Sequence, residues 1–381
     1  MTICVFIMCY LYILIAFVLS GALTLLVLPK ILFIAEQCSL YDMTDQRKNH
    51  KGKIPRIGGI SFIPCILIAV FLTFGLYFMN IDSADDSLPP NISEFNFFFS
   101  GILLLFLAGV KDDLVGIRYR HKFIFQILAS VLIVFSGVYV NNLHGFFGIH
   151  ELTPWIGMPL TVLILIFVVN AINLIDGIDG LASCISIIGL CVYGTLYQLQ
   201  GLWFYAILAF STVGVLIPFF YYNVFGNVKK GKKTFMGDSG SLSVGLILGF
   251  LFVRYLCYTP ELFLPLDNTI VIAISPILVP CLDTFRVMLV RAKKGKNIFV
   301  ADRNHIHHKL MDIGFKQSVS LVIIVCMCIG FCMINYMMIY FLRAEIIMVA
   351  DVFFWLMLNN YFNWLLRKQR YEIKSIHTIY N

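Results

Sequence analysis

The sequence predicts an all-α integral membrane protein, built as a bundle of about eleven transmembrane helices. Its composition is 60% hydrophobic and only 13% charged, a balance that soluble globular domains do not have. The mean hydropathy is +0.89. Apolar stretches long enough to cross a hydrocarbon core of about 30 Å recur along the chain. The basic residues gather in alternate loops, as they do in polytopic membrane proteins.

Eleven apolar stretches qualify as membrane spans. They run near residues 3–29, 58–79, 95–110, 122–140, 156–173, 180–199, 202–222, 240–258, 268–290, 318–341 and 345–366. The N-terminal stretch lacks the basic region and the small-residue cleavage pattern of a signal peptide, so it is interpreted as the first span. With no internal repeat and no polar linker, residues 1–381 are predicted to form a single domain.

The basic residues also predict the orientation of the bundle. Residues 30–57, 111–122, 223–238, 291–317 and the tail from Arg367 carry 25 of the 28 Lys and Arg residues. The loops 80–94, 141–155 and 259–267 carry none, but contain seven Asp and Glu residues. By the positive-inside rule, the first group faces the cytoplasm. Eleven spans then place the N-terminus outside and the C-terminus in the cytoplasm.

Two other features of the composition exclude common alternatives. The eleven cysteines lie mostly inside apolar stretches, without the spacing of a zinc site or a disulfide framework. They are interpreted as small hydrophobic residues. The net charge of +7 is explained by the cytoplasmic loops of a membrane protein, so no nucleic-acid partner is expected.

The most informative stretch is residues 170–180, which closes an apolar span with two amides, two carboxylates and two glycines. Its polar residues recur at every third position: Asn170, Asn173, Asp176 and Asp179. Residues three apart are neighbours on a helix, so these side chains are expected to share one face. The alternative is a polar helix end with a glycine stop. Because polar groups beside a membrane span are costly, a functional site is favoured.

Two further acidic motifs lie on the predicted cytoplasmic side. Asp112 and Asp113 follow the third span, and Asp238 opens the eighth span within a Gly-Asp-Ser-Gly-Ser sequence. Carboxylates of this kind can hold a divalent cation or act as a general base. The alternatives are a solvated helix end for the acidic pair and an N-cap for Asp238.

Two basic motifs complete the same face. Residues 47–59 include Lys51, Lys53 and Arg56, and residues 302–309 include Arg303, His305, His307 and His308. Such side chains can donate hydrogen bonds to phosphates, whereas the alternative for the first motif is an ordinary cytoplasmic loop. A histidine-rich tract also suggests transition-metal binding, but the flanking basic residues favour an anion site. Asp283 and Arg286 are expected to form a buried structural pair.

One face thus combines groups for a hard cation with groups for phosphates, beside a bundle that can accept a lipid. This combination suits phosphoryl transfer from a soluble nucleotide to a membrane-embedded acceptor. No Walker-type loop is present, so ATP hydrolysis is not indicated. A transporter or flippase is the alternative from another class, although transporters place ionisable residues near mid-span. A structural membrane protein is a third alternative.

Four ordered motifs resemble those of the polyprenyl-phosphate N-acetylhexosamine-1-phosphate transferases. They are the pair at Asp112, the amide and carboxylate series from Asn170 to Asp179, the Gly-Asp-Ser motif at Asp238, and His305-Ile-His307-His308. The resemblance covers about residues 54–310. The His-Ile-His-His form resembles the branch that transfers GlcNAc-1-phosphate, rather than the peptidoglycan translocase with its three consecutive histidines.

The resemblance implies a reaction, a cofactor and a location. N-acetylhexosamine-1-phosphate, GlcNAc-1-phosphate above all, would pass from a UDP-sugar to polyprenyl phosphate and release UMP, with Mg²⁺ or alternatively Mn²⁺. This would be the first membrane step of a cell-envelope glycan, on the cytoplasmic face of the bacterial plasma membrane. GalNAc, a deoxy-amino sugar or MurNAc-pentapeptide are alternative donors. A homodimer is left open.

The resemblance also assigns roles to residues. Asp238 and Asn173 would hold the metal, and Asp112 would orient or deprotonate the lipid phosphate with Asp113 in support. Asp176 and Asp179 would hold the nucleoside or the metal. The expected substrate-binding residues are Asn170, Arg303, His305, His307, His308, Lys51, Lys53 and Arg56.

Overall fold

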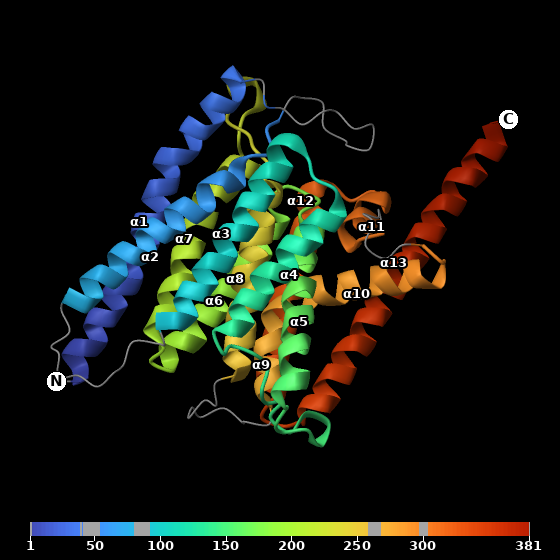
Figure 1. The fold of residues 1–381 in the computed structure, drawn as a ribbon. Helices are drawn as coiled ribbons and strands as arrows, with labels where there is room; N and C mark the ends of the chain where they lie inside the picture. The colour runs from blue at the N-terminus through green and yellow to red at the C-terminus, as the bar shows by residue number, and fades with distance from the viewer. Residues whose placement is uncertain are drawn as a thin grey trace.

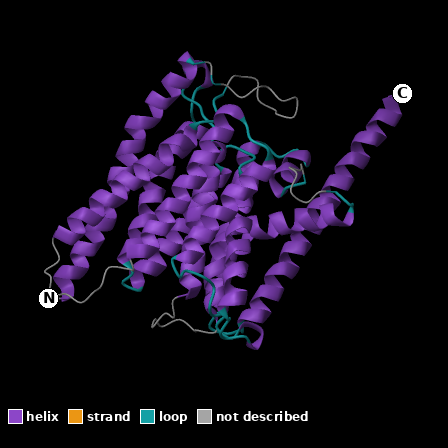
Figure 2. Ribbon diagram, viewed as in Figure 1, coloured by secondary structure: helices purple, strands orange, loops and turns teal. Residues whose placement is uncertain are grey.

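The protein is an all-helical bundle in the part of the chain that the structure describes (Figure 2). The structure is a computed structural model, and it describes residues 2–38, 40, 54–79, 92–257, 268–296 and 304–380. Among these residues, ten segments are long and apolar enough to cross a membrane. The predicted class, a multi-pass helical membrane protein, is thereby confirmed. The number of spans and their orientation stay predictions.

Thirteen α-helices are described, with short 3₁₀ turns between some of them (Figure 1). The α-helices are α1 (Thr2–Gln37), α2 (Phe62–Met79), α3 (Ile92–Val115), α4 (Tyr119–Phe135), α5 (Pro154–Ile175), α6 (Leu181–Leu199), α7 (Trp203–Val224), α8 (Gly237–Cys257), α9 (Thr269–Ile274), α10 (Leu278–Lys293), α11 (Ile306–Asp312), α12 (Gln317–Met338) and α13 (Ala344–Tyr380). The 3₁₀ turns are η1 (Gly58–Ser61), η2 (Phe146–Gly148), η3 (Val228–Lys230) and η5 (Ser275–Ile277).

Helix α4 is shorter than the span predicted at 122–140. It has 17 residues and ends at Phe135. At 1.5 Å per residue this corresponds to about 26 Å, slightly less than a typical hydrocarbon core. It nevertheless packs between α3 and α5 as a member of the bundle.

The span predicted at 268–290 is not one straight helix. The turn η5, which contains Pro276, separates α9 from α10. Proline lacks a backbone N–H and its ring clashes with the preceding turn, so it interrupts a helix at this point. Beyond the break, α10 runs across the bundle rather than along it (Figure 1).

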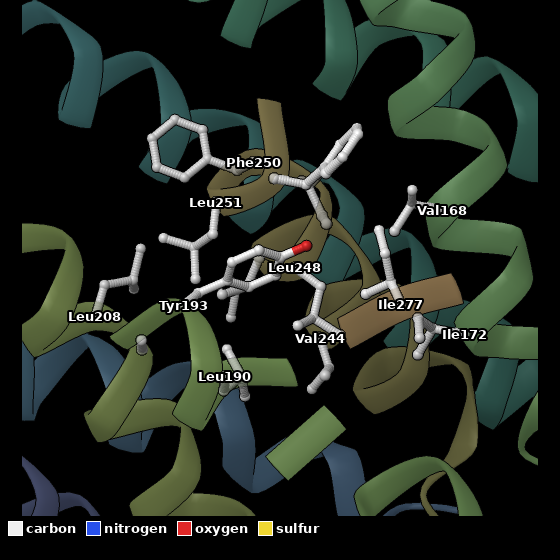
Figure 3. Packing of buried hydrophobic residues seen from close by; sticks show 14 of the residues in the cluster. Val168, Ile172, Leu190, Tyr193, Leu208, Val244, Leu248, Phe250, Leu251 and Ile277 are labelled. Carbon is white, nitrogen blue, oxygen red and sulfur yellow. The ribbon is translucent and has the colours of Figure 1, made fainter. Parts of the chain in front are cut away.

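Helix α8 forms the centre of the bundle. It is the most completely buried span, with 89% of its most apolar window buried, compared with 22% for α12. Figure 3 shows side chains of α8, among them Val244, Leu248 and Leu251, packed against residues from α5, α6 and α7. Helices in lipid associate through close packing more than through the hydrophobic effect. The high burial of α8 therefore identifies it as the helix around which the others pack.

One predicted loop residue proved to be part of the core. Glu94, assigned from the sequence to an outer loop, lies in the first turn of α3 and is only 5% exposed. Its Oε1 lies 3.0 Å from Nε of Arg254 and accepts a 2.7 Å hydrogen bond from the Tyr205 hydroxyl. The buried carboxylate is compensated by this pair, which joins α3, α7 and α8.

The predicted site motifs gather at one end of the bundle. The α3–α4 turn, the connection from α7 to α8, and α11 lie at the same end, whereas the α4–α5 connection and the start of α1 lie at the other (Figure 1). Segments that are far apart in the sequence therefore meet at a single face.

Candidate active site

The N-terminus of α8 is held by a carboxylate from another helix. Asp113, in the last turn of α3, accepts a hydrogen bond from the backbone N–H of Asp238 (2.7 Å) and another from that of Ser239 (2.9 Å). The first N–H groups of a helix lack partners within the helix, and a negative charge there is favourable. Asp113 thereby fixes the start of α8 and the position of Asp238.

Asp238 is the point where four helices converge. Its Oδ1 accepts a 3.0 Å hydrogen bond from Nδ2 of Asn173 on α5. Its Oδ2 contacts the ammonium group of Lys122, which comes from the first turn of α4. The same ammonium lies 3.0 Å from Oδ2 of Asp112 on α3. The structure thus brings together Asp112, Asp113, Asn173 and Asp238, as the motifs predicted.

Lys122 was not singled out from the sequence. In the sequence it is one of the four basic residues of loop 111–122, which contribute to the predicted topology. In the structure its charge neutralises two carboxylates that would otherwise repel each other. A single lysine among many in the basic loops carries no local signal of this role.

The stretch from 170 to 180 is not a continuous helix. Helix α5 ends at Ile175, and Asp176 and Asp179 lie in the turn before α6, so the expectation that all four polar residues share a helical face is wrong. Gly180 has a φ of +82°, which suits glycine and is incompatible with helix continuation. Asp179 Oδ2 lies 2.6 Å from Nζ of Lys233, a second basic residue that the sequence did not single out.

Asn170 has a different environment from the other predicted site residues. Its amide exchanges hydrogen bonds of 2.8 and 3.3 Å with the side chain of Gln126 on α4, which is only 1% exposed. It also donates to the carbonyl of Ile166. The two bonds to Gln126 join α5 to α4, whereas the bond to Ile166 lies within α5. The role of Asn170 in substrate binding stays a prediction.

Asp283 and Arg286 form the predicted buried pair. Asp283 Oδ1 lies 2.8 Å from Nη2 of Arg286, and the Asp283 side chain is 1% exposed. The other oxygen, Oδ2, lies 2.9 Å from Nδ1 of His305. The prediction is confirmed, and the structure adds His305 to the pair.

His307 faces the turn that carries Asp176. It is 1% exposed, and neither ring nitrogen has a hydrogen-bond partner among the described residues. A Cβ atom placed on Gly177 would lie 2.1 Å from its Nε2, so only glycine permits this approach. Burial lowers the pKa of His307 to about 3, with His308 and His305 adding to the effect and Asp283 opposing it. The imidazole is therefore neutral at physiological pH, with polar atoms facing the site.

The remaining predicted residues divide into two groups. The His308 ring centroid lies 4.2 Å from that of His307, and Arg56 lies in the loop before η1, close enough to act on Asp176. Lys51, Lys53 and Arg303 lie outside the described residues.

Asp176 is expected to titrate near neutrality. Burial raises its pKa to about 7, Arg56 counteracts this rise, and Asp179 and Asp113 add to it. The Arg56→Gln substitution should therefore raise this pKa further, since it removes the charge that favours the carboxylate. If the ionised form binds substrate, the acid limb of kcat/KM should move to higher pH in this variant. The matched control is Arg120→Gln at an exposed position, whose profile should stay unchanged.

The donor set suits a hard divalent cation. The carboxylates of Asp112 and Asp238 converge on one cationic group, the ammonium of Lys122. Among the described residues, no three His, Cys, Asp or Glu side chains form a cage by themselves. Mg²⁺ is typically bound through one or two carboxylates together with substrate phosphates and water, and two carboxylates focused on one positive charge fit that pattern.

A pocket lies beside the Asp179–Lys233 pair. It is lined by Leu32, Glu36, Ile54, Pro55, Val228, Gly231 and Lys233. The last of these residues is common to the pocket and to the ion pair. Lys233 thus connects the charged groups to a small hollow beside them.

The fold and this site define a polytopic helical membrane protein with carboxylates and basic side chains gathered at one end of the bundle. Residues 95–256 match the model of glycosyl transferase family 4. A probable undecaprenyl-phosphate N-acetylglucosaminyl 1-phosphate transferase of Bacillus subtilis (strain 168) is 28% identical over 317 residues, which is 82% of this chain and 81% of the relative. Two undecaprenyl-phosphate alpha-N-acetylglucosaminyl 1-phosphate transferases align over 294 residues, 76% of this chain and 74% of each relative. That of Yersinia pestis is 28% identical, and that of Escherichia coli (strain K12) is 29% identical.

The chain is similar to bacterial undecaprenyl-phosphate N-acetylglucosaminyl 1-phosphate transferases over about three quarters of its length or more, and to glycosyl transferase family 4 over residues 95–256. The matched range begins in α3 and ends in α8, so it contains Asp112, Asn173 and Asp238. The recognition made from the four motifs is confirmed.

Proposed function

We propose that this protein transfers GlcNAc-1-phosphate from UDP-GlcNAc to a polyprenyl phosphate and releases UMP. The names of the bacterial relatives support undecaprenyl phosphate as the acceptor and GlcNAc-1-phosphate as the transferred group. The observation that carries the proposal is the convergence of Asp112, Asp238 and Lys122 at the end of an otherwise apolar bundle. Lipid-soluble and water-soluble substrates can both reach such a place.

The reaction exchanges one phosphoanhydride partner for another. A lipid phosphate oxygen forms a bond to the sugar-bound phosphorus of the UDP-sugar. The bond from that phosphorus to the bridging oxygen breaks, and UMP leaves with this oxygen. A phosphate monoester has its second pKa near about 6, so the attacking group is largely dianionic at neutral pH. It requires orientation and charge neutralisation more than deprotonation.

The protein's own residues supply that orientation. Asp113 fixes the start of α8 and thereby Asp238, while Asn173 holds the Asp238 carboxylate through Oδ1. Lys122 is the positive group closest to these carboxylates and would pair with a phosphate when a metal ion neutralises them. Asp112 also contacts Lys122, and it would orient the incoming lipid phosphate through this lysine.

A divalent metal ion, Mg²⁺ in the first instance, would be held by Asp238 and Asp112 with Asn173 beside them. When bound, it supplies charge neutralisation for the diphosphate and the developing negative charge. His307, His308 and Arg56 line the same face and are assigned to the donor's phosphates or sugar. The neutral His307 can donate one N–H without the cost of a buried positive charge.

The proposal is tested by UMP release from the purified protein in lipid-containing medium. UDP-GlcNAc, polyprenyl phosphate and Mg²⁺ are supplied together and then omitted one at a time. We expect release only when all three are present. Replacing UDP-GlcNAc with UDP-GalNAc, a UDP-deoxy-amino sugar or UDP-MurNAc-pentapeptide identifies the donor. If no UDP-sugar releases UMP, transport of a lipid or sugar becomes the leading hypothesis.

A further inference from the structure

The helix that carries the histidines depends on its neighbours for its position. Helix α11 has only seven residues, and helices of that length are unstable in isolation. It packs against α12 and α13, and its apolar residues Ile306 and Leu310 are fully buried. Any group that fixes α11 therefore also fixes His307 and His308.

The beginning of α11 is attached to α10. Asp283 accepts a hydrogen bond from the backbone N–H of Ile306, 3.2 Å from each carboxylate oxygen, and contacts Nδ1 of His305. Arg286 donates to the carbonyl of Asn304, just before the helix. These bonds all lie at the start of α11. They do not fix the orientation of its second half, which depends on other contacts.

The other half of α11 is attached to α13 by a buried polar contact. Nζ of Lys309 donates a 3.1 Å hydrogen bond to Oδ1 of Asn359. Nδ2 of Asn359 donates to the carbonyl of Trp355, which orients the amide with its oxygen toward Lys309. Lys309 is 9% exposed and Asn359 is 3% exposed.

A lysine in this setting is unusual. Lysine is seldom this buried, and a buried ammonium normally has a carboxylate partner. Burial lowers the pKa of Lys309 to about 8, with Arg286 adding to the effect and Asp283 opposing it. An apolar residue at this position would be buried without the desolvation cost of an ammonium group. The lysine differs from such a residue by its hydrogen bond to Asn359 of α13.

We propose that Asn359 is a positioning residue for His307 and His308 and acts on them through Lys309. Helix α13 would thereby set how closely α11 approaches the turn at Gly177, where His307 Nε2 lies. This inference rests on the proposed function, since it assumes that the histidines bind the donor substrate. It assigns a role to a helix outside the matched range 95–256.

The first test compares two neighbouring asparagines of α13. Asn359→Leu removes the acceptor, whereas Asn360→Leu makes the same change at an exposed position. We expect Asn359→Leu to raise KM for the UDP-sugar about tenfold, because a hydrogen bond to a charged group is lost. KM for the polyprenyl phosphate should stay the same. Asn360→Leu should match the wild type, and Asn359→Asp, which keeps an acceptor, should restore most of the affinity.

The second test does not require activity. Diethyl pyrocarbonate modifies accessible imidazoles, and mass spectrometry gives the rate at His307. His307 is 1% exposed, so we expect protection in the wild type and in Asn360→Leu, and faster modification in Asn359→Leu and in Lys309→Met. The double variant should be modified no faster than either single variant, because both remove the same contact.

The two tests separate failure of this inference from failure of the proposed function. If the protein releases no UMP from any donor, the modification rates alone decide. An unchanged rate at His307 in both single variants overturns the inference. So does an unchanged KM for an identified UDP-sugar in a folded Asn359→Leu protein.

Discussion

Asp238→Asn should abolish UMP release, with a loss of at least about a thousandfold, comparable to the largest single electrostatic contributions in enzymes. The substitution keeps the size of the side chain and an oxygen that can accept from Asn173. It removes the negative charge that faces the ammonium group of Lys122. A metal ion bound to the diphosphate would then lose one of its two protein carboxylates.

The fold should tolerate this change, which makes the result interpretable. Asp113 bonds to the backbone N–H groups of residues 238 and 239, not to the Asp238 side chain, so the start of α8 stays capped. Lys122 keeps Asp112 as its partner. The matched control is Asp312→Asn, the same chemical change at an exposed position of α11, which should leave the rate unchanged. Full activity of the Asp238 variant at ordinary Mg²⁺ would remove this residue from the metal site.

The helical bundle could be predicted from the sequence because the bilayer imposes its own length on every span. Apolar stretches of about twenty residues are visible without any knowledge of packing. The predictions were wrong where tertiary packing determines the position of a residue or the course of a helix. The placement of Glu94 in the loop 80–94 is wrong, because Arg254 and Tyr205 compensate its carboxylate inside the bundle. The bend at Pro276 was missed because the hydropathy of the segment does not change there.

The site was predicted in part, for a comparable reason. Carboxylates and amides are unusual at the ends of apolar spans, so the sequence predicts Asp112, Asn173 and Asp238 as site residues. The lysines that pair with the carboxylates of the site are not unusual in the sequence. Lys122 and Lys233 look like the other basic residues of their loops, and only the three-dimensional structure shows which lysine meets which carboxylate. The regular spacing from Asn170 to Asp179 predicted one shared helical face, which is wrong because α5 ends at Ile175.

The histidines illustrate the same limit. The tract at 305–308 predicted an anion site as a unit, yet the structure divides its members. His305 is engaged by Asp283, which lies 22 residues earlier, whereas His307 faces Gly177 with both ring nitrogens free of partners among the described residues. Such a division depends on which way a short helix faces, and that follows from contacts with α10 and α13.

Gly109→Ala should lower the rate of UMP release by about a hundredfold although Gly109 lies outside the charged cluster. Gly109 is buried in α3, three residues before Asp112. A Cβ atom there would lie 2.5 Å from Cα and 2.7 Å from the backbone nitrogen of Ser239. Both are backbone atoms of α8, so no side-chain rotation can relieve the contact. Helices α3 and α8 would have to separate at the level where Asp113 caps α8 and Asp112 shares Lys122 with Asp238.

Two opposing effects decide the sign of this prediction. Alanine favours a helix over glycine by about 1 kcal/mol. Overpacking a tight interface costs about 1–3 kcal/mol, and the rigid backbone neighbours place this site toward the upper end. We therefore expect a modest loss of thermal stability, an unchanged helix content by circular dichroism, and a rate lowered by about a hundredfold, as misplaced reacting groups typically cause.

Gly75→Ala on α2 is the matched control, because nothing lies within 4 Å of a Cβ atom built there. It should gain stability or stay neutral and keep full activity. Equal activity of the two variants would mean that α3 and α8 can separate without disturbing Asp112 and Asp238. The close approach at Gly109 would then serve the packing of the bundle alone, and the geometry of the site would have to be maintained by the Lys122 contacts.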